Sequence, residues 1–105
     1  MEISTTEEPG RVCIKVIGRI DQRGADELKR SFKKLDLSSF AEVIFDFKEV
    51  SHIGSAGIGK MLLFERCVSE AGDRMLIENV SELVYYLITD LNLEGILKVT
   101  RYPTE

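Results

Sequence analysis

The sequence has little that would point to a metal, a membrane or a nucleic acid. Its two cysteines form no CxxC pair and its single histidine is distant from both, which argues against a metal or redox site and predicts two buried, reduced thiols. No apolar run approaches the roughly 18 residues of a membrane-spanning helix. The start, MEISTTEEPG, is acidic and polar, unlike a secretory signal. We therefore expect a cytoplasmic protein without membrane insertion, cofactor or metal.

The charge distribution gives a similar exclusion. The net charge is −4, and the basic residues are scattered along the sequence. A nucleic-acid surface needs clustered lysine and arginine to displace counterions, so no nucleic-acid partner is expected. With 44% apolar and 30% charged residues in a chain of 105, the composition is that of one globular domain over residues 1–105. Residues 1–10 are expected to form an edge strand or a flexible segment.

Hydrophobic periodicity predicts alternating strands and helices. Strands are expected at 12–18, 43–47, 74–78 and 96–99. Amphipathic helices are expected over 21–37, from the glycine-rich stretch to residue 72, and from Ser81 as N-cap to Leu91. Parallel neighbours need crossover helices, so this order predicts an α/β fold, a mixed sheet of about four to five strands with amphipathic helices packed on it.

The stretch HIGSAGIGKM (52–61) is unusually poor in side chains. It comes within one residue of the phosphate-binding pattern G-x-x-x-x-G-K-[ST], but Met61 stands where a hydroxyl should hold Mg²⁺. It also misses the nucleophile pattern G-x-S-x-G, because Ile53 occupies the first glycine position. His52 is then expected to be a turn or surface residue at a strand end, not the base of a catalytic pair.

What remains is a short loop that enters a helix with Ser55 in its first turn. Two interpretations of this serine stay open. It is a favoured residue for capping a helix N-terminus, and it is also a residue that can carry a phosphate where the helix dipole tolerates negative charge. Asp46, near the end of the preceding strand, is expected either to orient this loop through hydrogen bonds or only to end the strand.

Four segments, in order, resemble the STAS domain family in its single-domain form, the anti-sigma factor antagonists. These are GRID (18–21) with the ADELK helix after it, VIFDFKEVSHIGSAGIG (43–59), ENVSELVYYL (78–87) and LNLEGILKV (91–99). The resemblance implies a non-enzymatic regulatory module. It captures a partner that is both anti-sigma factor and serine kinase, releases it when phosphorylated, and is reset by a phosphoserine phosphatase.

Carried over to this chain, the family's phosphorylated serine is Ser55. The partner-binding positions are expected to be Asp21, Gly54, Ser55, Ala56, Gly57 and Ile58, with helix capping as the alternative role of Asp21. The family pattern has an aspartate where this chain has Gly54, and this difference is expected to change which kinase or phosphatase recognises Ser55. The terminal helix of many members is expected to be missing or vestigial. The alternative function is a STAS subunit of another regulatory or transporter-associated assembly, in which Ser55 is only a helix cap. The sequence leaves the oligomeric state open.

Overall fold

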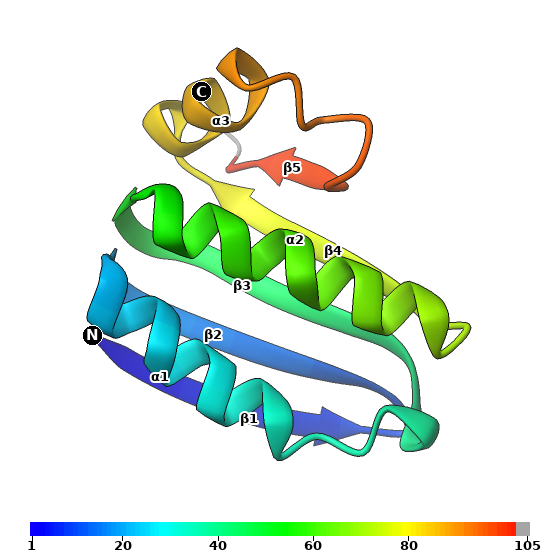
Figure 1. Ribbon diagram of the computed structural model, residues 1–105. Helices are drawn as coiled ribbons and strands as arrows, with labels where there is room; N and C mark the ends of the chain where they lie inside the picture. Colours follow the sequence, from blue (N-terminus) through cyan, green and yellow to red (C-terminus); the bar gives the residue numbers. More distant parts are fainter. Residues whose placement is uncertain (103–105) are drawn as a thin grey trace.

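A computed structural model describes residues 1–102 and shows one mixed sheet with two long helices packed across it (Figure 1). Strand β1 is antiparallel to β2, and all other neighbours are parallel in the order β1-β2-β3-β4-β5. The elements are β1 (Glu2–Glu8), β2 (Gly10–Ile20), α1 (Gln22–Lys33), a 3₁₀ turn (Leu37–Ser39), β3 (Phe40–Ile53), α2 (Ser55–Glu70), β4 (Arg74–Val80), α3 (Glu82–Asp90) and β5 (Val99–Arg101). The predicted α/β class is confirmed.

The core lies between the sheet and the helices α1 and α2. Leu28 and Phe32 on α1 are buried at the helical spacing that the sequence indicated, and Phe64 on α2 is buried as well. The ring of Phe64 stacks on Phe32 with centroids 4.3 Å apart and on Phe45 of β3 at 5.8 Å. These three rings therefore join both helices to the centre of the sheet.

Strand β3 is much longer than the predicted segment 43–47. It continues through a polar stretch to Ile53, which pairs with Ile20 at the end of β2. Asp46 consequently neither ends the strand nor orients the Ser55 segment. Its Oδ1 accepts hydrogen bonds from the Lys48 N–H at 3.0 Å and from Asn79 Nδ2 at 3.2 Å. The long strand places the end of β3 beside the end of β2.

The predicted last strand, 96–99, is shifted along the chain. Residues 91–97 form turns after α3, and β5 begins only at Val99. Leu97 is 1% exposed because it fills the core, whereas Ile96 is 54% exposed. The prediction of a strand at 96–99 is therefore wrong for Ile96 and Leu97, because Leu97 fills the core from a turn. The expectation of a missing terminal helix bears on residues 103–105, which lie outside the described residues.

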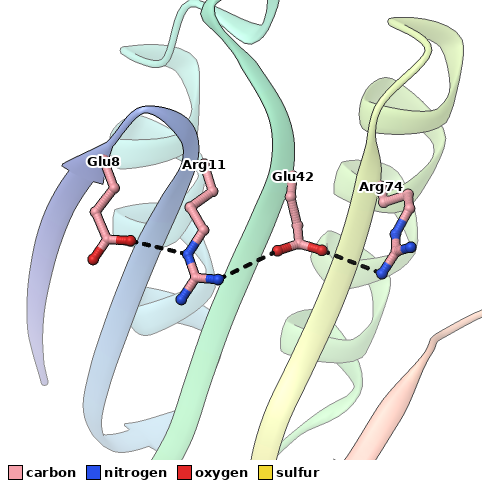
Figure 2. Close-up of polar contacts among 4 residues, drawn as sticks. All are labelled: Glu8, Arg11, Glu42 and Arg74. Atoms are coloured by element: carbon pink, nitrogen blue, oxygen red, sulfur yellow. Dashed lines mark hydrogen bonds and ion pairs between the residues drawn. The ribbon is translucent and has the colours of Figure 1, made fainter.

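The sheet face opposite α1 and α2 carries a row of ion pairs near the start of β2, β3 and β4 (Figure 2). Arg11 Nε lies 3.0 Å from Glu8, Arg11 Nη1 lies 3.9 Å from Glu42, and Arg74 Nη2 lies 3.2 Å from the other oxygen of Glu42. The row is thus at the opposite end of these strands from the edge at which the helices begin. Such exposed pairs contribute little stability each.

The two cysteines are half-buried, not buried as predicted. Cys13 points to the sheet face opposite α1 and α2, because its neighbours Val12 and Ile14 face the core. Burial, and then the carboxylates of Asp46 and Glu78, raise the pKa of its thiol. Within residues 1–102, no helix is long and apolar enough to cross a membrane.

Candidate functional site at the start of the helices

Three helices begin at one edge of the sheet. The strands β2, β3 and β4 are parallel, so their carboxyl ends meet at this edge, and α1, α2 and α3 start there with N-caps Asp21, Gly54 and Ser81 (Figure 1). The Gly54 N–H donates to the Ile20 carbonyl at 3.0 Å, which fixes the start of α2 beside the start of α1. Two helix N-termini, each with partial positive charge, are therefore adjacent.

Asp21 caps α1. Its Oδ1 accepts a hydrogen bond from the Gly24 N–H at 2.9 Å, and this bond, more than any other contact, lowers the pKa of the carboxyl group. The interpretation of Asp21 as a helix cap is confirmed, and its side chain is also exposed at the edge. It lines a polar pocket of about 360 Å³ together with Arg19 and Arg23. These two arginines were missed in the sequence, although GRIDQR places them on both sides of the cap.

The start of α2 has no side-chain cap. Gly54 is the only residue between β3 and α2, and its extended backbone (φ −93°, ψ 179°) places it at the N-cap position. Ser55 is the first residue of the helix and is exposed. The interpretation of Ser55 as a helix cap is therefore wrong. By contrast, Ser81 caps α3 as predicted, since its Oγ accepts from the Val84 N–H at 3.2 Å.

The first N–H groups of α2 have no intrahelical partner, as in every helix, and no side-chain cap supplies one. The first backbone bond of the helix runs from the Ile58 N–H to the Gly54 carbonyl, at 3.0 Å. The N–H groups of Ser55, Ala56 and Gly57 precede that bond, so they can receive an acceptor from outside the helix. The exposed hydroxyl of Ser55 stands at this same position.

The glycine-rich stretch is not a loop. Residues 56–59 form the first turns of α2, and Gly57 is buried against the sheet. A Cβ atom at Gly57 would lie 2.6 Å from Ile20 Cγ2 and 2.7 Å from Ile53 Cγ1. Ile58 is also in the core. Of the six predicted partner-binding residues, the structure thus keeps these two away from the surface.

The remaining four lie together at the edge. Asp21 and Ser55 are exposed, and Gly54 and Ala56 are partly exposed. Their role in partner binding stays a prediction.

In the described residues 1–102, His52 does not point toward Ser55. Successive strand residues point to opposite faces, so His52 faces away from Ile53, on whose side α2 packs. Lys60 lies within α2 and not at the mouth of a phosphate-binding loop. In residues 1–102, no group of three histidine, cysteine, aspartate or glutamate side chains has the geometry of a metal site.

Comparison with known proteins identifies the family. The STAS domain model matches residues 2–105, so the chain belongs to the STAS domain family. Among solved structures, the anti-sigma factor antagonist SpoIIAA in its unphosphorylated form is 18% identical, with a TM-score of 0.76 over 99% of this chain and 90% of that one. SpoIIAA of Bacillus in the phosphorylated form is 17% identical, with a TM-score of 0.73 over 99% and 93%.

Two further structures show how widely this fold is used. An anti-sigma factor antagonist from Mycobacterium paratuberculosis is 17% identical, with a TM-score of 0.82 over 98% of this chain and 86% of that one. A sulfate transporter family protein from Wolinella succinogenes is 18% identical, with a TM-score of 0.80 over 92% and 81%. At these identities the likeness establishes the fold.

Proposed function

We propose that this chain is a cytoplasmic, non-enzymatic regulatory module of the anti-sigma factor antagonist type, switched by phosphorylation of Ser55. In the unphosphorylated form, the edge formed by Asp21, Gly54, Ser55 and Ala56 binds an anti-sigma factor that is also a serine kinase. Phosphorylation of Ser55 releases that partner, and a phosphoserine phosphatase restores binding. The observation that carries the proposal is the exposed Ser55 hydroxyl at the uncapped start of α2.

The fold can accept a phosphate at Ser55 at small cost. The phosphate adds a charge of about −1.5 to −2, and the unpaired N–H groups and the dipole of α2 favour negative charge at this end. The adjacent N-terminus of α1 adds to the same field, although the Asp21 carboxylate opposes it. A likeness to SpoIIAA in both of its forms is in keeping with a domain that stays folded when phosphorylated.

The same phosphate is unfavourable for a partner bound at this edge. The partner would have to accommodate about two negative charges and their hydration, and burying a charge without a counterpart costs several kcal/mol. Because each 1.4 kcal/mol is a factor of about ten, a loss of affinity of a hundredfold or more is expected. The phosphate therefore breaks the complex without unfolding the domain.

The test begins with protein recovered from its native host, analysed by intact mass and peptide mapping. Ser55 should carry a phosphate under some growth condition. As baits in native lysate, the wild type and Ser55→Ala should retain the same partner, and Ser55→Asp should lose it. Ser69→Asp is the matched control, because it adds the same charge at an exposed position on the other end of α2.

All variants should give the same circular dichroism spectrum as the wild type. The proposal fails if no phosphate is found on Ser55 and Ser55→Asp retains every partner that the wild type binds. It also fails if Ser69→Asp releases the partner as completely as Ser55→Asp, because the effect would then be one of net charge.

A second candidate function is a subunit of a transporter-associated or other regulatory assembly. It is favoured by the likeness to the sulfate transporter family protein. In that case Ser55→Ala and Ser55→Asp should bind the same partner equally well. A gene for a serine kinase beside the gene for this chain supports the first function, and transporter genes beside it support the second.

A further inference from the structure

A groove between α1 and α2 combines an apolar floor with a basic rim. It has a volume of about 260 Å³, and its lining includes Phe32, Leu35, Leu37 and Leu63, with Lys29 and Lys33 on the α1 side. Leu63 is 40% exposed, so the groove leaves apolar surface in contact with water. Binding sites for whole small molecules are usually larger, about 300–1,000 Å³, so a groove of this size suits side chains of a protein better.

The basic rim belongs to a local concentration of positive charge. The second half of α1 carries Lys29, Arg30 and Lys33, and its C-cap residue is Lys34, with no acidic residue between Glu27 and Asp36. None of the four forms an ion pair with another residue in the described range 1–102. In a chain of net charge −4, this half-helix is thus an unpaired positive site beside exposed apolar surface.

The opposite combination is found on α3 and the turn after it. No basic residue occurs between Arg74 and Lys98, and the acidic residues Asp90 and Glu94 are exposed and form no ion pair within residues 1–102, whereas Glu82 pairs with Arg101 of β5 at 3.5 Å. Large apolar side chains are exposed beside them, with Leu83 at 50%, Tyr86 at 62% and Leu91 at 53%. Residues three, four, seven and eight apart share one face of a helix, so Leu83, Tyr86, Asp90 and Leu91 form one acidic and apolar face. We call this face, together with Glu94 in the turn that follows it, the α3 face.

We propose that this chain associates with itself head to tail, the α3 face of one copy occupying the α1–α2 groove of the next. The two surfaces are complementary. Both expose apolar side chains, and the groove carries positive charge where the α3 face carries negative charge. Exposed apolar patches rimmed by polar residues are typical of protein interfaces, and opposite charges select the partner and its orientation. A second copy is the occupant because this chain itself supplies both complementary surfaces.

The positions of the two surfaces determine the form of the assembly. In Figure 1, α1 and α3 lie on opposite sides of α2, so in the proposed contact each copy presents its two surfaces to two different neighbours. A contact of this kind is heterologous and builds open chains or rings. Ser55 stays accessible, because Phe64, which also lines the groove, is nine residues further along α2, about 13 Å. The groove side of the contact is therefore separate from the proposed phosphorylation switch.

The experiment is sedimentation velocity on the whole chain from about 10 µM to about 1 mM, the range in which weak contacts become populated. We expect the mean sedimentation coefficient to rise with concentration past the value of a dimer. We also expect it to fall with added salt, since the rim charges are exposed. Charge reversal of the groove (Lys29→Glu with Lys33→Glu) or of the α3 face (Asp90→Lys with Glu94→Lys) should weaken association at least tenfold.

A mixture of the two double variants gives the sharpest result. Each variant alone brings like charges together, but the acidic groove of one fits the basic α3 face of the other, and their two unchanged surfaces also fit. An equal mixture should therefore associate as the wild type does. Lys15→Glu with Lys48→Glu is the control, because it changes the net charge equally on strands β2 and β3, away from the groove, and should leave association unchanged.

Three results would overturn the proposal: a wild type that stays monomeric throughout, a mixture that does not associate, or a control that weakens association as much as the groove variant. If a double variant fails to fold, the amide chemical shifts of the wild type are measured as a function of concentration. Residues of both the α1–α2 groove and the α3 face must then change their shifts with concentration. Shifts confined to one of them contradict a head-to-tail contact.

Discussion

The same substitution at two glycines of α2 should change stability in opposite directions. At Gly57, an added Cβ would lie 2.6 Å and 2.7 Å from the side chains of Ile20 and Ile53, and 3.2 Å from the Ile20 carbonyl oxygen. Carbon atoms prefer separations of about 3.5–4.0 Å, so α2 must move away from the sheet by close to 1 Å. Both isoleucines are buried, so neither side chain can turn away into solvent. At Gly59, an added Cβ meets nothing within 4 Å.

The expected magnitudes follow from these distances. Overpacking of this kind costs about 1–3 kcal/mol, and replacing glycine by alanine inside a helix returns about 0.5–1 kcal/mol. Gly57→Ala should therefore lower the free energy of unfolding by about 0.5–2 kcal/mol. Gly59→Ala has only the favourable contribution and should raise it by about 0.5–1 kcal/mol. At roughly 4–8 °C per kcal/mol, the two melting temperatures should lie clearly on either side of the wild type.

Urea unfolding followed by far-ultraviolet circular dichroism measures both effects, since the chain has no tryptophan to report by fluorescence. Unchanged m-values would show that the comparison concerns the folded state and not the compactness of the unfolded chain. If Gly57→Ala is as stable as the wild type, α2 does not pack on Ile20 and Ile53 at the distances described. If Gly59→Ala is destabilised, that part of α2 is not an exposed helix.

Three further predictions concern the surface. Gly54→Asp restores the carboxylate of the family pattern and should keep or slightly raise the melting temperature: the backbone at Gly54 has negative φ, an added Cβ approaches only the Ile20 carbonyl oxygen at 3.8 Å, and aspartate is a good N-cap. A large loss of stability would contradict that geometry. Asp21→Ala should lower the melting temperature at neutral pH, and the difference from the wild type should shrink as the pH falls. The cap lowers the folded-state pKa of Asp21 below 3.8, so its stabilisation is complete above that value and is lost as the pH falls through the folded-state pKa. A difference that grows toward acid would refute this in a pH series of melting curves. Glu42→Gln interrupts the row of ion pairs in Figure 2 and should cost less than about 1 kcal/mol, diminishing with salt. A larger, salt-independent loss in urea unfolding would show that the row matters more than exposed pairs normally do.

Local features of the molecule were predictable from local sequence. The spacing of Ala25, Leu28 and Phe32 predicts α1, because a helix places residues three and four apart on one face, and that face is buried. The caps Asp21 and Ser81 were predictable for a similar reason, since a cap bonds to an N–H group only three residues away. The resemblance to the STAS family, carried by four short segments, was confirmed over residues 2–105.

The site itself depended on contacts between distant segments. Polar residues such as Glu49 and His52 do not predict a strand, but pairing with the end of β2 holds them in β3 and leaves Gly54 as the only residue before α2. This pairing makes Ser55 the first residue of the helix and not its cap. The sequence contained the serine, the glycines and a charged half-helix, and by itself it determined the class of fold. Only the tertiary structure, in which α2 packs on Ile20 and Ile53, decided that Gly57 is buried and that Ser55 is exposed. Burial depends on neighbours that are far away in the chain.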